Sequence, residues 1–290
     1  MDKIFPDDIK CASIISPAGY PDEYGLAGGI ELLESCGIKV KVMPHAIGCR
    51  DSKFPYLAAS DEARASDFMQ AYCDPECDII IASRGGYGCG RILDLIDWEM
   101  LKKHPQKLVA GYSDLTSLFL AMTAMQCGIP LASVMAAKLS SCQKRDFESL
   151  FAACCGKRRS FTLDTVKGGA ASGTVLAGNL TVFASCAATP YMPDVAGRVL
   201  FLEEIGEDCY RIDRLLNQLR LAGILSRCAG VIFGSLTGCQ NADIEPVLEH
   251  YAKFVNGPVL KNFSYGHELP FEALRYQDNI TIHGKKVVIN

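Results

Sequence analysis

Short apolar runs alternate with longer amphipathic segments through the first half of the chain. The runs predict strands, because four to eight residues rich in Ile, Val and Leu are typical of buried strands. The spacing of apolar residues between the runs predicts helices. The predicted strands are 9–16, 38–43, 78–82 and 108–111, and the predicted helices are 24–36, 60–72, 91–96 and 115–126. This alternation predicts an α/β fold with a parallel sheet covered by helices on both faces.

The pattern changes between residues 144 and 172, which divides the chain into two parts. Residues 156–172 are mostly polar and small, include the pair Gly168-Gly169, and predict a linker or a crossing strand. The predicted helices of the later part are 180–187, 212–222 and 244–254, its strands are 199–203 and 230–234, and a hairpin covers 280–289. We therefore expect one domain over 1–155 and a smaller α/β domain over 173–290.

Composition narrows the class of protein. Nearly half of the 290 residues are hydrophobic, so a sizeable core is available, and the net charge of −4 is spread along the chain. No basic stripe suggests nucleic acid. The polar start lacks the pattern of a signal peptide, and the longest apolar stretch, near 118–125, is too short to span a bilayer. We expect a cytoplasmic protein without nucleic-acid or membrane partners.

The 14 cysteines are expected to be reduced structural thiols. Several fall in predicted core segments, where Cys behaves as a small hydrophobic residue. A disulfide framework is unusual in a long chain without a signal peptide. Cys73 and Cys77, and the adjacent Cys154 and Cys155, have no CxxC partner pair that would indicate zinc. We expect neither a metal nor a cofactor.

Four predicted strands end in residue types that hydrolases use. The fourth of these strands is the run 258–264, and the residues that follow the four strands are Arg84-Gly85-Gly86-Tyr87-Gly88, Ser113-Asp114, Glu203-Glu204 and His267. Sites of open α/β sheets lie beyond the carboxyl ends of the strands. A Gly-rich turn, a Ser, a Glu and a His at such ends could form an oxyanion pocket, a nucleophile, an orienting carboxylate and a base.

Each of these residues also has a structural interpretation. Ser113 or Asp114 could cap the helix that follows. The glycines do not fit a dinucleotide fingerprint, and they could make a tight turn or a backbone pocket for an oxyanion or carboxylate. Strand alternation sends Glu203 and Glu204 to opposite faces, and either could lie at the surface. For His267 the alternative is a hydrogen-bonded structural role.

Basic and aromatic residues provide candidates for substrate contacts. Arg84 and Tyr87 flank the glycines of the first motif. Arg211 and Arg214 share one face of a predicted helix through their i,i+3 spacing. These two could hold a substrate carboxylate or pair with nearby Asp and Glu residues, and we favour pairing for at least one of them, since surface ion pairs are common.

Seven motifs occur together in this chain. They are Arg84–Gly88, Gly111–Thr116, Gly178–Leu180, Thr189–Tyr191, Leu200–Glu204, Tyr210–Arg214 and Tyr265–His267. In this order they resemble the LD-carboxypeptidase family of serine peptidases, which includes muramoyltetrapeptide carboxypeptidases and microcin C self-immunity peptidases. The resemblance extends from about Cys11 to the C-terminal hairpin, and the ordered set is far more specific than any one motif.

The resemblance implies a catalytic triad of Ser113, His267 and Glu203. It also implies an oxyanion pocket made by backbone N–H groups of Asp114 and of the Gly85-Gly86 turn. The implied fold is an N-terminal Rossmann-like domain and a smaller C-terminal α/β domain, with the triad divided across the cleft between them. The family resemblance further implies a homodimer.

The same resemblance implies that the chain removes terminal D-Ala from cell-wall tetrapeptides in peptidoglycan recycling, through an acyl-enzyme. Ala132-Ser133-Val134-Met135 stands where the family has His-Gly-Pro-Met, which leaves the triad intact and alters the pocket. One alternative is a microcin-type peptidase that cleaves peptidyl- or aminoacyl-nucleotides and stacks an aromatic residue on the base; Trp98 is the only Trp. A non-catalytic nucleotide- or muropeptide-binding protein is the other alternative, and the intact Ser, Glu and His argue against it.

Overall fold

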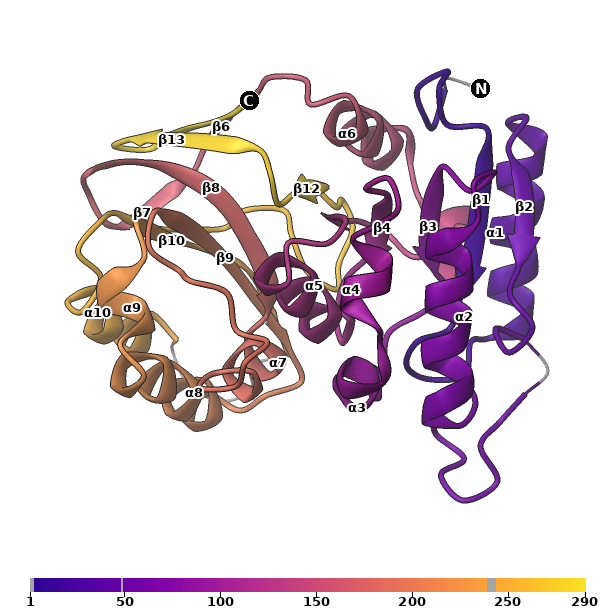
Figure 1. Cartoon of the computed structure of the whole chain (residues 1–290). Coiled ribbons are helices and arrows are strands. Elements are labelled where there is room, and N and C mark those ends of the chain that lie inside the picture. Colours follow the sequence, from indigo (N-terminus) through magenta and orange to yellow (C-terminus); the bar gives the residue numbers. More distant parts are fainter. Residues whose placement is uncertain (1–2, 48, 239–243) are drawn as a thin grey trace.

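The computed structural model describes residues 3–47, 49–238 and 244–290. Two sheets lie side by side in a mixed α/β arrangement (Figure 1). The first half of the chain forms most of one sheet, and the second half forms the other. This agrees with the predicted α/β class. Over the three described ranges, no helix combines the length and the apolar character needed to cross a membrane.

The first sheet has the strand order β12-β5-β4-β3-β1-β2. Its strands are β1 (Cys11–Ile15), β2 (Lys39–Val42), β3 (Ile79–Ala82), β4 (Leu108–Gly111), β5 (Ile129–Ala132) and β12 (Leu274–Arg275). β1 to β5 run parallel, and β12 pairs antiparallel to β5. β1 and β3 lie inside the sheet and are buried along their whole length, which explains why their sequences are almost entirely apolar.

The helices of the first half are α1 (Glu23–Ser35), α2 (Asp61–Cys73), α3 (Cys89–Ile92), α4 (Trp98–Leu101), α5 (Leu115–Ala124) and α6 (Lys144–Cys154), with the 3₁₀ helices η1 (Leu93–Leu95) and η2 (Ala136–Ser141). α1, α2 and α5 agree with the predicted ranges to within two residues, whereas the predicted helix 91–96 is divided between α3 and η1. Asp22 and Ser60 cap α1 and α2 through their side chains. α5 is apolar on almost every side because it lies between the two sheets, where it contacts β5, β8 and α7.

The second sheet has the strand order β6-β14-β13-β8-β9-β10-β11-β7. Its parallel centre consists of β8 (Ala170–Asn179), β9 (Arg198–Ile205), β10 (Gly230–Thr237) and β11 (Val259–Lys261). Antiparallel strands β6 (Arg159–Thr162), β7 (Asp164–Lys167), β13 (Asn279–His283) and β14 (Lys286–Ile289) complete it. Its helices are α7 (Leu180–Ser185), α8 (Cys209–Leu221), α9 (Ile224–Arg227) and α10 (Glu245–Ala252).

The segment 156–172 is built into the second sheet. It contains β6 and β7 and the first residues of β8, so it is more than a linker or a single crossing strand. β6 and β7 form the two opposite edges of the sheet. Edge strands have one unpaired side and stay partly exposed, so their sequences carry no apolar run that would reveal them.

After β11 the chain crosses from the second sheet back to the first. The backbone N–H of Phe271 donates to Asp146 Oδ1 at 2.7 Å, and that of Ala273 donates to Ser149 Oγ at 2.9 Å. Both acceptors lie on α6, and the chain then pairs as β12 with β5. His267 lies on this crossing segment, residues 262–273, whose two ends are fixed to different sheets.

Candidate active site

Ser113 lies in the sharp turn between β4 and α5. Its backbone φ is +64°, in the left-handed region that non-glycine residues seldom adopt. The turn presents the hydroxyl beyond the carboxyl end of β4, in the manner of a nucleophile elbow. Neither side chain caps α5: Asp114 is the N-cap residue without a side-chain bond, and its carboxylate accepts the N–H of Cys89 at 2.7 Å. The capping interpretation is therefore wrong for α5.

A row of hydrogen bonds joins Ser113, His267 and Glu203. His267 Nε2 lies 3.1 Å from Ser113 Oγ, and His267 Nδ1 lies 2.8 Å from Glu203 Oε2. Glu203 comes from β9 and is fully buried. Burial raises the pKa of its carboxyl, and the contact with His267 opposes that rise. The edge of Tyr112 packs against the imidazole with ring centroids 5.0 Å apart, which limits rotation of the base.

The neighbouring carboxylate, Glu204, points the other way. Strand alternation predicts this, and both residues are buried, so the surface interpretation is wrong for each. Glu204 Oε2 accepts the N–H of Thr181 at 2.8 Å and Oε1 accepts Asn179 Nδ2 at 2.9 Å. Glu204 thus binds the first turn of α7, where an anion is favourable, and leaves the His267 contact to Glu203.

The Gly-rich turn lies directly against Ser113. A Cβ atom on Gly85 would lie 2.9 Å from Ser113 Cβ and 3.0 Å from Ser113 Oγ, so only glycine allows this approach. The carbonyl of Gly85 accepts the N–H of Gly19 at 3.2 Å. Within the described ranges, the backbone N–H groups of Gly85, Gly86 and Asp114 donate no hydrogen bond to the protein. They are available to an oxygen atom of a ligand.

A cavity of about 300 Å³ opens beside Ser113 and His267. Arg84, Lys138 and Asp22 supply its other charged side chains. Arg84 donates to the backbone carbonyls of Tyr20 and Gly85, both at 3.2 Å. In the part of the chain that the structure describes, neither Arg84 nor Lys138 forms an ion pair with a carboxylate. Two cations at the cavity are thus available to an anionic ligand group.

Lys138 and Asp22 were not predicted as site residues. Asp22 also caps α1, where its side chain accepts the N–H of Gly25 at 2.6 Å. Lys138 lies on η2, just after the segment Ala132–Met135 that departs from the family pattern. That departure was the sequence feature that could have indicated residues of the pocket near Lys138, since Met135 and Ala137 also line the cavity.

Two predicted substrate contacts do not lie at this cavity. Tyr87 is 55% exposed and packs against Tyr56, with ring centroids 6.0 Å apart. Arg211 pairs with Glu207 Oε2 at 3.2 Å and lies over the ring of Tyr210. Neither side chain is among those that line the cavity. Arg211 therefore forms an ion pair, as the alternative interpretation predicted.

Among the residues that the structure describes, no cysteine and no tryptophan lines the cavity beside Ser113. The cysteines in the described ranges are free thiols, and many are buried. The same ranges contain no group of three His, Cys, Asp or Glu side chains arranged for a metal ion. Trp98 is buried and donates its indole N–H to the Leu93 carbonyl at 3.1 Å, so it packs away from the cavity.

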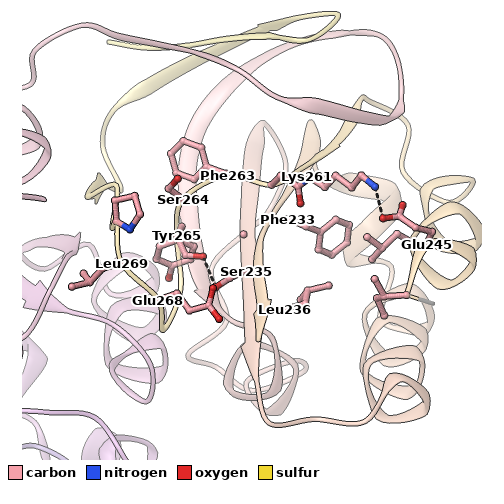
Figure 2. A pocket seen from close by; sticks show the side chains of 15 residues that line it. Phe233, Ser235, Leu236, Glu245, Lys261, Phe263, Ser264, Tyr265, Glu268 and Leu269 are labelled. Atoms are coloured by element: carbon pink, nitrogen blue, oxygen red, sulfur yellow. Dashed lines mark hydrogen bonds and ion pairs between the residues drawn. The ribbon is translucent and has the colours of Figure 1, made fainter. Parts of the chain in front are cut away.

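A second cavity, of about 380 Å³, is lined in part by residues 263–265 and 268–270, on either side of His267 in the sequence (Figure 2). It is formed at the carboxyl ends of β10 and β11, and an ion pair between Lys261 and Glu245 closes one side. Ser235 donates its N–H to the Tyr265 carbonyl at 2.9 Å. This cavity contains none of the three hydrogen-bonded residues, and its wall supports the backbone two residues before His267.

Both halves of the chain match models of one protein family. Residues 12–133 match the LD-carboxypeptidase N-terminal domain, and residues 172–282 match the LD-carboxypeptidase C-terminal domain. A putative carboxypeptidase of Streptomyces coelicolor is 33% identical, over 88% of this chain and 84% of its own. A probable murein peptide carboxypeptidase of Bacillus subtilis is 32% identical, over 90% and 85%.

A solved structure shows the same architecture. The crystal structure of muramoyltetrapeptide carboxypeptidase from Oxalobacter formigenes superposes with a TM-score of 0.85 at 26% identity, covering 97% of this chain and 98% of that one. Both halves of the chain, and the arrangement of the two sheets, are therefore shared with this group of peptidases. The chain belongs to the LD-carboxypeptidase family, and it is a serine-type carboxypeptidase.

Proposed function

We propose that Ser113 is the nucleophile of this carboxypeptidase, with His267 as its base and Glu203 as the residue that orients the base. His267 Nε2 takes the hydroxyl proton as Ser113 Oγ attacks the scissile carbonyl carbon. The same nitrogen then gives the proton to the leaving amine. Water then attacks the acyl-enzyme: His267 Nε2 takes a proton from the water and gives it to Ser113 Oγ as the acyl bond breaks. Glu203 holds the Nδ1–H tautomer and stabilises the imidazolium between these steps.

The negative oxygen of the tetrahedral intermediate is assigned to the backbone N–H groups of Asp114 and of the Gly85-Gly86 turn. These donors lie around Ser113 and have no protein acceptor in the described ranges. Fixed donors of this kind stabilise charge that develops in the transition state, and losing one costs about 10²–10³-fold in kcat.

The substrate is assigned as a murein tetrapeptide from which terminal D-Ala is released, a step of peptidoglycan recycling. The names of the Bacillus and Oxalobacter relatives support this class. A carboxypeptidase must recognise a free terminal carboxylate. Arg84 and Lys138 at the cavity provide cations for it, with Arg84 able to make two parallel hydrogen bonds.

The observation that carries the proposal is the hydrogen-bonded row from Ser113 through His267 to Glu203. The test is to incubate the protein with a purified tetrapeptide and follow D-Ala by mass spectrometry. Ser113→Ala should lower turnover by about 10⁴-fold or more, because triad residues act as a unit. A Ser113→Ala variant that keeps a sizeable fraction of wild-type turnover excludes Ser113 as the nucleophile.

Two further aspects of the proposal need separate measurements. A nucleotide-linked substrate is less favoured, because Trp98 packs away from the cavity and supplies no stacking surface for a base. Assaying an aminoacyl sulfamoyl nucleoside beside the tetrapeptide compares the two substrate classes directly.

The proposed homodimer is tested by light scattering coupled to size-exclusion chromatography.

A further inference from the structure

Thr116 connects the turn that carries Ser113 to the second sheet. It lies in the first turn of α5 and is almost completely buried. Its hydroxyl donates to the Ser113 carbonyl at 2.7 Å and accepts the backbone N–H of Asn179 at 2.9 Å. Because the hydroxyl both donates and accepts, one side chain joins a backbone group of each half of the molecule.

The connection continues to β9. Asn179 Nδ2 donates to Glu204 Oε1 at 2.9 Å, and Glu204 is held in turn by Thr181 Oγ1 at 2.7 Å and by its other donors. Each of these residues except Thr181 is at most 5% exposed. Buried hydrogen bonds of this kind are costly to break, because the groups left behind have no water to replace the partner. The row from Ser113 to Glu204 is thus a fixed link.

The contact between the two halves is also tight. A Cβ atom on Gly178 would lie 2.4 Å from Thr116 Cγ2 and 3.1 Å from its hydroxyl oxygen. Glycine at this position therefore allows β8 to approach α5 closely enough for the hydrogen bond to form. Asn179 and Glu203 are also register partners in the β8–β9 ladder, so the link starts beside the proposed triad carboxylate.

The planarity of the peptide unit gives this link a consequence for catalysis. The Ser113 carbonyl and the Asp114 N–H belong to one rigid plane and point in opposite directions. Holding the carbonyl on one side fixes the direction of the N–H on the other. The Thr116 N–H also donates to the same carbonyl, at 3.0 Å, so the plane is held by two donors.

We infer that Thr116 is a positioning residue that aims the Asp114 N–H at the developing oxyanion, and that Glu204 anchors it through Asn179. Consecutive residues of β9 then serve the two halves of the site: Glu203 orients the base, and Glu204 orients the backbone of the nucleophile. This inference rests on the proposed serine mechanism. It assigns a role to Thr116 and Glu204 that needs no contact with substrate.

The test compares Thr116→Val with Thr116→Ser. Valine has nearly the same shape but can neither donate nor accept, whereas serine keeps both bonds. Thr116→Val should lower kcat about 10–100-fold with KM changed less than about threefold, since a misaimed oxyanion donor is worth part of a deleted one. Labelling of Ser113 by a fluorophosphonate should slow in parallel. Thr116→Ser should keep most of the wild-type rate.

Thr123→Val is the matched control. Thr123 lies on the same helix and its hydroxyl donates to the Phe119 carbonyl at 2.7 Å, but it does not touch the site. If Thr116→Val and Thr123→Val have the same kcat, or if Thr116→Ser is as impaired as Thr116→Val, the inference is wrong. Should Thr116→Val not fold, Glu204→Gln weakens the far end of the link, because its amide has one acceptor oxygen where the carboxylate has two, and it must lower kcat more than Thr123→Val does.

The outcomes also separate this inference from the proposed function. A wild-type protein that releases D-Ala, a Ser113→Ala variant that does not, and an unimpaired Thr116→Val leave the serine mechanism standing and reject the link. Equal turnover of wild type and Ser113→Ala rejects the serine mechanism itself.

Discussion

Replacing Gly85 by Ala should strongly impair the enzyme with little effect on folding. The added Cβ would lie 2.9 Å from Ser113 Cβ, whereas carbon atoms in contact prefer about 3.5–4.0 Å. Gly85 is not among the residues with positive φ, so alanine adds no backbone strain there. Ordinary contact is restored only if Ser113 or the glycine turn moves away by about 0.6–1 Å.

A displacement of that size has a predictable kinetic effect. Misplacing a reacting group by about 1 Å costs about 100-fold, which corresponds to about 2.7 kcal/mol of transition-state stabilisation. We therefore expect Gly85→Ala to lower kcat/KM for D-Ala release by about 100-fold. Overpacking of about 1–3 kcal/mol should lower the unfolding temperature by only several degrees.

The helix that follows this turn offers a control for the prediction. Gly90 lies in α3, and a Cβ there would have Ser117 Oγ as its nearest neighbour at 3.9 Å, an ordinary contact. Gly90→Ala should keep wild-type activity and stabilise the helix slightly, by about 0.5–1 kcal/mol. Full activity in Gly85→Ala, or equal losses in both variants, would show that the approach of Gly85 to Ser113 does not matter for catalysis.

Three further predictions concern the two carboxylates of β9, the pH dependence of stability, and the requirement for metal or thiols. Glu203→Gln should lower kcat about 10³–10⁴-fold because it no longer stabilises the imidazolium, whereas Glu204→Gln should lose only about tenfold; the reverse order in steady-state kinetics would redraw the triad. Because burial raises the pKa of Glu203 above its ordinary 4.5, the folded protein binds that proton more tightly than the unfolded chain does. The free energy of unfolding, measured in urea, should therefore fall relative to that of Glu203→Gln as the pH rises from about 4.5 through the raised pKa; a difference independent of pH contradicts this. Activity should survive EDTA and mild alkylation, and a loss that zinc restores would reveal a metal requirement.

Helices and strands with a strong apolar pattern could be predicted from the sequence. β3 and β4 are continuous apolar runs, and β1 is interrupted only by Ser13, because helices cover both faces of these strands. β6 and β7 could not be recognised, because they are sheet edges with little apolar surface. The two-residue strand β12 also escaped, because its position depends on a pairing with β5 that lies more than 140 residues away in the sequence.

The residues of the site also fall into two groups, those that could be predicted from the sequence and those that could not. Ser113, Glu203 and His267 could be selected because each follows a predicted strand, and the family resemblance decided between Glu203 and Glu204. Strand alternation alone could not decide between these two residues, since both faces of β9 are buried. Lys138 and Thr116 were not assigned roles: their importance comes from a cavity and a hydrogen bond that exist only once the two sheets are packed together.

The crossing segment 262–273 limits how this enzyme can move. It leaves β11 in one sheet and enters β12 in the other, and His267 lies within it. A hinge motion that separated the sheets would stretch the segment and draw the imidazole away from Ser113. A hinge motion of the two sheets is thus incompatible with the hydrogen bond between His267 and Ser113. A substrate must therefore enter and leave through the opening of the cavity. A chain cut between β11 and β12 would lose this tether, and with it the mechanical coupling that keeps base and nucleophile at hydrogen-bonding distance.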